Sequence, residues 1–301
     1  INKKNLLLNK EIRNSYINKI DYNVFKSFLK TIKNVKKFHK LQLPVDQELS
    51  ENGVSLKLKW KAIDSVGLYI PGGTAEYPSS LIMNAVPAIV SGVKRIVCVT
   101  PPSKSFNPYT LGILDKLGIK EVYQIGGAQA IGALTYGTET IDPVNKIFGP
   151  GNQYVTSAKK QVFGKVGIDL IAGPSEIIVV ANEKNNPKWV ASDLMAQAEH
   201  DTNAQSILIT NNKVFANKVL EKINYLINDL PKKQIINKSL KQHGLIILVE
   251  NIFQSSEIIN FIAPEHLHLH VKGKNKIFKN IRNAGAIFMG EYATEAFGDY
   301  I

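Results

Sequence analysis

The sequence predicts an α/β fold in which mainly parallel sheets are covered by helices, with two sheets rather than one. Short apolar runs, typical of buried strands, alternate along the chain with stretches of helical period. Turns rich in glycine and proline follow several of the apolar runs. The length of 301 residues is sufficient for two domains of ordinary size.

The N-terminal residues 10–40 are expected to be helical, because Phe25, Leu29 and Ile32 are spaced as neighbours on one helix face. Further helices are expected at 79–92, 108–117 and 128–136, after Gly151, and between the later strands. Strands are expected at 65–70, 95–99, 121–125, 177–181, 206–210, 245–249 and 286–289. This alternation is typical of βαβ units, which build parallel sheets.

The composition favours a cytoplasmic enzyme. Contents of 44% hydrophobic and 21% charged residues are those of a globular protein and exclude intrinsic disorder. No apolar run approaches the roughly 18–20 residues that cross a membrane, and the first residues lack the apolar core of a secretory signal. Cys98 is the single cysteine, which excludes an internal disulfide framework and a cysteine-based zinc finger.

The net charge of +12 raises the question of nucleic-acid binding. The excess is almost entirely lysine, since Arg13, Arg95 and Arg282 are the only arginines. Proteins that read nucleic acids depend on arginine for bidentate contacts and gather their charge in a coherent patch. Here the lysines are scattered apart from a short cluster in the N-terminal helix, so no nucleic-acid partner is expected.

Four glycine-containing turns are candidates for ligand binding, at 69–73, 125–129, 148–152 and 172–176. Ligands of open α/β sheets bind at the carboxyl ends of the strands, where glycine lets the backbone approach them. Each turn has the alternative interpretation of a simple tight turn. None is a dinucleotide fingerprint, because Tyr154 replaces the third glycine of the pattern that begins at 149.

Two segments concentrate side chains that could carry chemistry. Gln197 and His200 are three residues apart on a helical pattern and share a face, so they could hold a metal with partners from elsewhere. The second segment is residues 263–270, with the sequence APEHLHLH. If it is a strand, its three histidines point the same way and resemble a metal cluster. If it is a turn that leads into a strand, Glu265 and His266 could line a cleft as separate acid and base groups.

From about residue 60 to its end, the chain resembles the histidinol dehydrogenase family. The resemblance rests on VGLYIPGGTAEYPSSLIMNAVPA, YQIGGAQAIGALTYGTE, NKIFGPGNQYVTSAKK, AGPSEIIVVA, ASDLMAQAEHD, APEHL and IRNAGAIFMGEYATEAFGDY, in this order. Residues 1–59 match only loosely. The family fold is a pair of incomplete Rossmann-like domains in a homodimer, which agrees with the missing fingerprint.

The resemblance implies a zinc-dependent, NAD-linked, four-electron oxidation of L-histidinol to L-histidine through L-histidinaldehyde, the last step of histidine biosynthesis. It implies one Zn²⁺ per subunit, with Gln197, His200 and Asp299 as ligands, and Glu265 and His266 as the catalytic pair. The residues that match its NAD contacts are Tyr69, Gln129 and Asn152. The residues that match its substrate contacts are Ser175, Gln197, His200, His266 and Asp299. His268 and His270 match no ligand of the family and are expected to be structural.

The chain is expected to be a piece of a longer protein, since it begins with Ile1 and stops just after the GDY motif at 298–300. Members of the family continue beyond this motif. Their tail supplies a further zinc-ligand histidine to the partner subunit and a substrate-binding glutamate. We therefore expect the 301 residues alone to bind zinc poorly and to have little activity.

Two of the glycine turns mark the expected crossings between domains, at 70–72 and 173–175. The second domain, residues 70–176, is then inserted into a first domain made of residues 1–69 and 177–301. The active site is expected in the cleft between the two domains. Alternative functions are a zinc hydrolase that uses the same histidine, glutamate and aspartate residues, and an inactive remnant that only binds.

Overall fold

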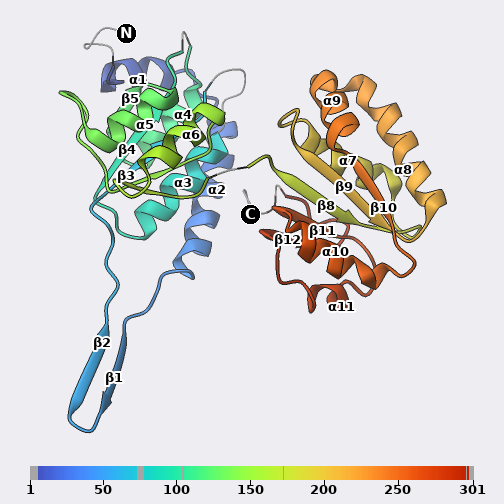
Figure 1. Cartoon of the computed structure of the whole chain (residues 1–301). Coiled ribbons are helices and arrows are strands. Elements are labelled where there is room, and N and C mark those ends of the chain that lie inside the picture. Colours follow the sequence, from blue (N-terminus) through green and yellow to red (C-terminus); the bar gives the residue numbers. More distant parts are fainter. Residues whose placement is uncertain (1–5, 73–77, 104, 172, 296, 298–301) are drawn as a thin grey trace. The chain divides into compact units, whose positions relative to one another are not determined.

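The computed structural model describes residues 6–72, 78–103, 105–171, 173–295 and 297 (Figure 1). The chain divides into two compact units, Ile1–Ala172 (unit 1) and Gly173–Gly298 (unit 2). Each unit contains one five-stranded sheet in which all neighbouring strands are parallel. The predicted α/β class and the prediction of two sheets are therefore confirmed.

Unit 1 begins with two helices, α1 (Lys10–Ile17) and α2 (Tyr22–Lys40), where one helical stretch was expected. The break comes from a second helix start, because the side chain of Asp21 accepts a hydrogen bond from the backbone N–H of Asn23. Phe25, Phe28 and Ile32 then pack α2 against the core of unit 1.

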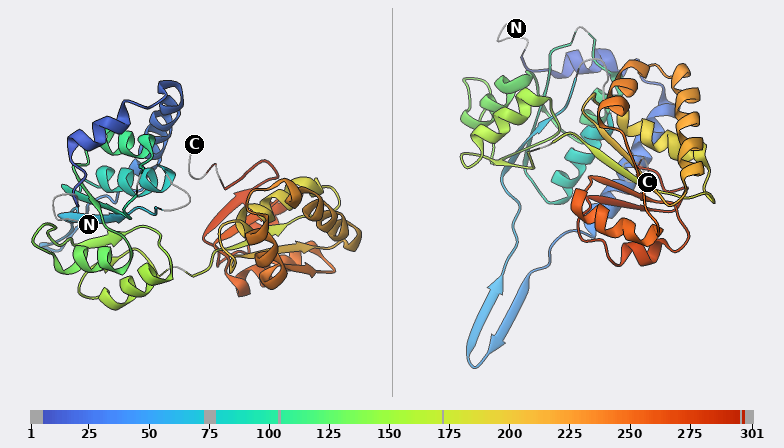
Figure 2. Two further views of the ribbon diagram at one scale, coloured as in Figure 1. Left: turned by 90° about the horizontal axis from the view of Figure 1, so that it is seen from above. Right: turned by 45° about the vertical axis from the view of Figure 1, so that its right-hand side comes forward.

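The sheet of unit 1 has the strand order β5-β4-β3-β6-β7. Its strands are β3 (Ser65–Tyr69), β4 (Arg95–Thr100), β5 (Glu121–Gln124), β6 (Lys146–Phe148) and β7 (Gly167–Ile168). Its helices are α3 (Pro78–Val90), α4 (Pro108–Lys116), α5 (Gly127–Tyr136) and α6 (Gln153–Val162). Alternate residues of β3 face opposite sides, so Val66 and Leu68 pack with α3 and α4, and Tyr69 packs on the α5 and α6 side. Both faces are thus covered by helices (Figure 2).

A hairpin of β1 (Gln47–Glu51) and β2 (Val54–Leu58) extends from unit 1 as an arm (Figure 1). Asn52 and Gly53 form its turn with φ of 51° and 80°, the left-handed conformation that tight hairpins require. Every residue of both strands is exposed. The hairpin and the two-residue strand β7 were not expected from the sequence.

Unit 2 repeats the strand order, as β10-β9-β8-β11-β12. Its strands are β8 (Glu176–Val180), β9 (Gln205–Thr210), β10 (Leu245–Leu248), β11 (His266–Leu269) and β12 (Ala286–Met289). Its helices are α7 (Pro187–Ala198), α8 (Lys213–Leu226), η2 (Ile227–Asp229), α9 (Lys233–His243), η3 (Ile252–Gln254), α10 (Ser255–Ile262) and α11 (Lys274–Phe278). Helices α7 and α8 pack over Ile177 and Val179 on one face, and α10 and α11 pack over Leu267 and Leu269 on the other.

The strand pairing corrects the expected domain boundaries. Residues 65–69 were expected to join the domain of residues 177–301, but β3 pairs with β4 and β6 and is the central strand of unit 1. The crossing expected at 70–72 is therefore wrong, while the crossing expected at 173–175 coincides with the start of unit 2. None of the described helices combines the length and the apolar character that crossing a membrane would require.

Candidate active site

The three residues expected to contact NAD lie at the carboxyl edge of the sheet in unit 1. Tyr69 ends β3 and is buried, and its hydroxyl accepts a hydrogen bond of 3.1 Å from the backbone N–H of Gly127, at the start of α5. Gln129 is exposed on the first turn of the same helix. Asn152 caps α6 and accepts from the N–H groups of the next turn at 3.1 and 3.2 Å. The structure thus brings Tyr69 and the start of α5 together and places Asn152 at the head of the next helix.

The turn between β6 and α6 is held by a close backbone approach and a buried ion pair. A Cβ atom on Gly149 would lie 2.1 Å from the carbonyl oxygen of Tyr69, so only glycine fits there. The backbone N–H of Gly149 donates to Asp169 Oδ2 at 2.8 Å, and its carbonyl accepts from Lys159 Nζ at 3.0 Å. Lys159 is 4% exposed and also pairs with Asp169 Oδ1. The chain thus turns tightly at this position, and NAD binding at the same edge stays a prediction.

In unit 2, helix α7 and strand β11 bring together two residues that the sequence analysis singled out separately. Gln197 lies on the last turn of α7 and is 2% exposed. His266 starts β11, and its Nδ1 lies 3.0 Å from Oε1 of Gln197. Glu295 Oε2 lies 3.7 Å from the same nitrogen. Glu295 was not singled out as a site residue, although it lies within the quoted EYATEAFGDY motif.

The other candidates described in unit 2 lie at the amino edge of the same sheet. Ser175 is half-buried just before β8, and Glu265 is exposed just before β11. The backbone carbonyl of Glu265 accepts from Ala286 N at 2.8 Å, which fixes this segment beside the start of β12. His200 is exposed after the end of α7, in the loop that leads to β9. Asp299 lies outside the described residues.

The donor types at the end of α7 fit a zinc ion. His200 N donates to the carbonyl of Gln197 at 3.2 Å, so the two residues stand on one continuous turn. The amide oxygen of Gln197 has two lone pairs and can therefore accept from His266 and still hold a metal. Imidazole nitrogen and side-chain oxygen are both donors that zinc accepts. Two of the three expected ligands, Gln197 and His200, therefore lie among the described residues, and their binding of zinc stays a prediction.

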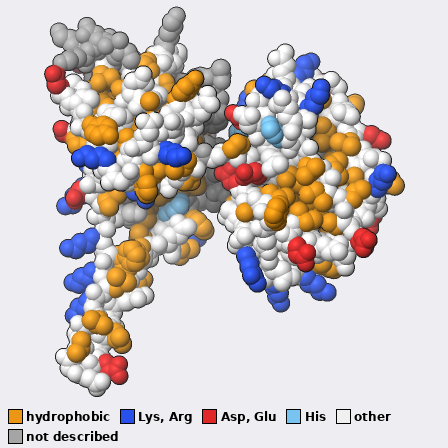
Figure 3. Space-filling view, viewed as in Figure 1, with side chains coloured by type: hydrophobic (Ala, Val, Ile, Leu, Met, Phe, Trp, Pro, Cys, Tyr) orange, Lys and Arg blue, Asp and Glu red, His pale blue; other side chains and the backbone are white. Residues whose placement is uncertain are grey.

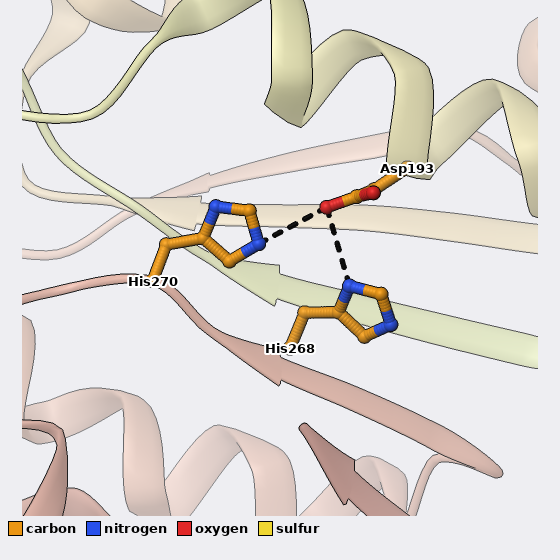
Figure 4. A group of neighbouring side chains, drawn as sticks. All are labelled: Asp193, His268 and His270. Atoms are coloured by element: carbon orange, nitrogen blue, oxygen red, sulfur yellow. Dashed lines mark hydrogen bonds and ion pairs between the residues drawn. The ribbon is translucent and has the colours of Figure 1, made fainter. Parts of the chain in front are cut away.

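A second polar cluster lies deeper along the same helix and strand (Figure 4). Asp193 Oδ2 lies 3.2 Å from His268 Nδ1 and 3.0 Å from His270 Nε2. Burial alone would raise the pKa of the Asp193 carboxyl, but its contacts with the two imidazoles lower that pKa below its ordinary value. Residues 266–269 form a strand and residues 263–265 do not, so the segment matches the expectation of a turn that leads into a strand. Asp193 was missed, although it lies one helical turn before Gln197 and its spacing could have identified it.

The comparisons with known proteins agree on one family. The model of the histidinol dehydrogenase family matches residues 2–301. Histidinol dehydrogenase 1 of Nostoc sp. is 50% identical over 269 residues, which cover 89% of this chain and 62% of that protein. Histidinol dehydrogenase of Brucella suis is 51% identical over 269 residues, which cover 89% of this chain and 63% of that protein.

A solved structure gives the same result for the fold. The crystal structure of histidinol dehydrogenase from Elizabethkingia anophelis superposes with a TM-score of 0.94 at 36% identity, covering 98% of this chain and 69% of that one. This chain spans 62–63% of the length of the two curated relatives named above. It belongs to the histidinol dehydrogenase family.

Proposed function

We propose that this chain is part of an enzyme that oxidises L-histidinol to L-histidine through L-histidinaldehyde, with zinc and NAD, as the last step of histidine biosynthesis. The observation that carries the proposal is the 3.0 Å contact between His266 and Gln197. It joins a residue that resembles the family's catalytic base to one that resembles a zinc ligand. A cytoplasmic location is part of the same proposal.

The contact with Gln197 favours the tautomer of His266 that can act as a base. An amide oxygen only accepts hydrogen bonds, so this contact favours the imidazole tautomer with its proton on Nδ1. Nε2 then keeps its lone pair and takes the hydroxyl proton of the substrate as the hydride passes to NAD⁺. When bound at Gln197 and His200, zinc would hold the amine and imidazole of the substrate and fix the reacting carbon.

Glu265 is proposed to act in the second half of the reaction. Its exposed carboxylate takes a proton from water as the water oxygen adds to the aldehyde carbon, and the aldehyde oxygen takes up the proton that His266 gained in the first oxidation. The product is a gem-diol, and His266 is again able to accept a proton. The gem-diol then loses a hydride to a second NAD⁺ and a proton to His266. The balance is L-histidinol, two NAD⁺ and one water giving L-histidine, two NADH and three protons.

The proposed NAD site is the carboxyl edge of unit 1, with Tyr69, Gln129 and Asn152. The starts of α5 and α6 offer backbone N–H groups there, which suit a pyrophosphate. Ser175 is proposed to contact the substrate. Asp299 is the third proposed zinc ligand, and a histidine of the partner subunit's C-terminal segment is the fourth.

A homodimer is proposed for the whole protein. The hairpin arm supports it, because the arm carries apolar side chains that are at least half exposed (Figure 3). Leu49 and Leu56, each 61% exposed, face each other across the two strands. Apolar side chains gathered on a projecting arm are typical of a surface that a second chain covers.

The test uses the chain joined to the part of the Brucella suis relative that follows the GDY motif, here named the extended chain. NADH formed per L-histidinol consumed is measured before chelation, after chelation and after zinc is restored. We expect two NADH per substrate, lost on chelation and regained with zinc, and little turnover from the 301 residues alone. A folded, zinc-loaded extended chain that forms no NADH contradicts the proposal and favours a zinc hydrolase.

A further inference from the structure

The cluster of Asp193, His268 and His270 in unit 2 has no part in the proposed oxidation. Asp193 lies one helical turn before Gln197 on α7, His268 lies in β11 two residues after His266, and His270 directly follows this strand. Figure 4 shows Asp193 pointing toward both histidines. Helix α7 and strand β11 therefore carry two successive sets of polar contacts. The first joins Gln197 to His266, and the second joins Asp193 to both of the other histidines.

Two of the distances between donor atoms of these side chains are close to those between ligand atoms of a tetrahedral metal site. Oδ2 of Asp193 lies 3.2 Å from Nδ1 of His268 and 3.0 Å from Nε2 of His270. All the candidate ligand atoms lie within 4.8 Å of one another. Zinc bonds of about 2.0–2.1 Å set neighbouring ligand atoms of a tetrahedral site roughly 3.3 Å apart. Two imidazoles and one carboxylate also form a common set of three protein ligands for zinc.

Hydrogen bonding within the described part of the chain leaves one of the three proposed donor atoms without an aligned partner. His268 Nδ1 has a hydrogen-bond contact of 3.2 Å with Asp193 Oδ2, whereas His270 Nε2 comes within 3.0 Å of the same oxygen but has no aligned hydrogen bond among the described residues. The two histidines are only 2% and 5% exposed. Buried polar atoms are nearly always paired, and exceptions of this kind often mark an ion or a water.

The negative charge of the Asp193 carboxylate also favours a bound cation. The Asp193 carboxylate is largely buried, and among the described ion pairs its partners are the two imidazoles and no lysine or arginine. Val179 and Phe288, which flank His268 on the neighbouring strands, are apolar. A buried carboxylate needs a positive partner, and a divalent ion between the three donors would supply one.

We propose that Asp193 Oδ2, His268 Nδ1 and His270 Nε2 bind a Zn²⁺ ion in a second metal site of unit 2, with water as the fourth ligand. This site is separate from the ligand set of Gln197, His200 and Asp299, and it does not depend on the proposed oxidation. Its ion links α7 to β11 one turn away from Gln197 and His266. The site therefore stabilises unit 2 and holds the helix and strand that carry those two residues.

The test measures zinc bound by the 301-residue chain. The protein is stripped with a chelator, reloaded with Zn²⁺, separated by gel filtration and analysed for metal. The poor zinc binding expected of the 301 residues concerns the ligand set of Gln197, His200 and Asp299. At the second site we expect the wild-type chain to retain one Zn²⁺, and X-ray absorption to count two imidazole ligands on it. Loss of one supporting residue weakens metal sites by about 10–100-fold, so Asp193→Asn and His268→Gln should weaken binding by at least about 100-fold.

Two matched variants control for a general effect of losing a histidine. His200→Gln removes the exposed imidazole of the other ligand set, and His243→Gln removes one at the end of α9. Both should keep the zinc ion and its two imidazole ligands. Zinc lost in His200→Gln and retained in Asp193→Asn would overturn the proposal, and so would a wild-type chain that retains no zinc.

A readout on the wild-type chain keeps the test valid if the buried variants fail to fold. Co²⁺ replaces Zn²⁺ in such sites, and we expect one equivalent of Co²⁺ to give the visible absorption of a tetrahedral site in both the wild-type chain and His200→Gln. A spectrum of six-coordinate Co²⁺, or one that His200→Gln abolishes, would contradict the proposal. Failure of L-histidinol oxidation in the extended chain would leave these results unchanged, so the two proposals fail separately.

Discussion

The two five-stranded sheets have the same strand order, with the first strand of each sheet at the centre, the next two strands on one side and the last two on the other. They differ in what they present at their edges. In unit 1, the carboxyl edge carries glycine turns and the starts of α5 and α6, so it offers mainly backbone N–H groups. In unit 2, the amino edge carries ionisable and amide side chains next to α7 and β11.

This difference shows how one scaffold can serve two kinds of chemistry. Backbone groups at a glycine turn suit a bound phosphate, because they approach it closely and point at it together. Side chains at a helix–strand contact suit proton transfer and metal binding, because each is held by its neighbour. The strand order, which the two sheets share, predicts neither phosphate binding nor proton transfer. The residues at the edges of each sheet distinguish the two.

The largest effect is expected at His266, in unit 2. His266→Asn in the extended chain removes the proposed base and should lower the rate of both hydride transfers by about 10²–10⁴-fold. Single-turnover formation of NADH measures this loss, with His243→Asn as the control. A rate within threefold of wild type would show that the amino edge of unit 2 does not carry the proton transfer.

Glu265 should separate the two halves of the reaction. Glu265→Gln keeps a polar side chain of the same size, so oxidation of the alcohol should persist, while oxidation of added L-histidinaldehyde should fall by about 10²-fold. The measurement compares NADH formation from the two substrates in parallel assays. Equal effects on both would contradict the role proposed for this carboxylate.

In unit 1, the substitution that tests the edge of the sheet is made at a glycine of a backbone turn, and not at a reactive side chain as in unit 2. Gly149→Ala places a Cβ 2.1 Å from the carbonyl oxygen of Tyr69, at φ of 116°. Gly164→Ala, at φ of 99° with no atom within 4 Å, is the matched control for backbone strain alone. We expect the first variant to lose about 2–3 kcal/mol more unfolding free energy than the second.

Urea unfolding measures both glycine variants. Because Lys159 and Asp169 hold the same turn, Gly149→Ala should also weaken binding of NAD⁺. Equal free energies of unfolding for the two variants would show that the backbone of the turn moves to accommodate the added Cβ atom. The turn would then not hold the edge of the sheet in one position.

The smallest effect is expected at Cys98, which reports on unit 1 alone. The thiol lies in the middle of β4 and is 1% exposed, and burial raises its pKa above the ordinary range. Reaction with a thiol reagent should therefore be slow in the native chain and should stay slow as the pH rises to about 9, because little thiolate forms. Zinc bound in unit 2 should change this rate by less than twofold. A larger change would show that the two units open together.

Much of the fold could be predicted because local patterns decide it. The alternation of Leu267 and Leu269 with His266 and His268 matches a strand with two different faces. The hairpin was missed, although Asn52-Gly53 is a strong turn signal and the apolar residues of β2 alternate with polar ones, because the first strand carries one apolar residue and neither strand is buried. The place of residues 65–69 in unit 1 could not be predicted, because it depends on pairing with residues 146–148, far along the chain.

Candidate site residues could be singled out from the sequence, but the contacts between them could not. Gln197 and His266 were singled out for separate roles, and their contact depends on how α7 packs over β11. The same packing brings Asp193 to His268 and His270, which the resemblance had set aside as structural. Sequence spacing identifies residues that share a face of one element. Contacts between elements require the tertiary structure.

The division of work between the two units is tested most directly by two exposed residues, Gln129 in unit 1 and His200 in unit 2. The measurement is the pair of KM values, for NAD⁺ and for L-histidinol, in Gln129→Ala and His200→Gln of the extended chain. We expect Gln129→Ala to raise the KM for NAD⁺ by roughly tenfold, and His200→Gln to raise the KM for L-histidinol by at least as much and to lower zinc content. Each variant should leave the other KM within about twofold. Two variants that both change the same KM would contradict the assignment of cofactor to unit 1 and substrate to unit 2.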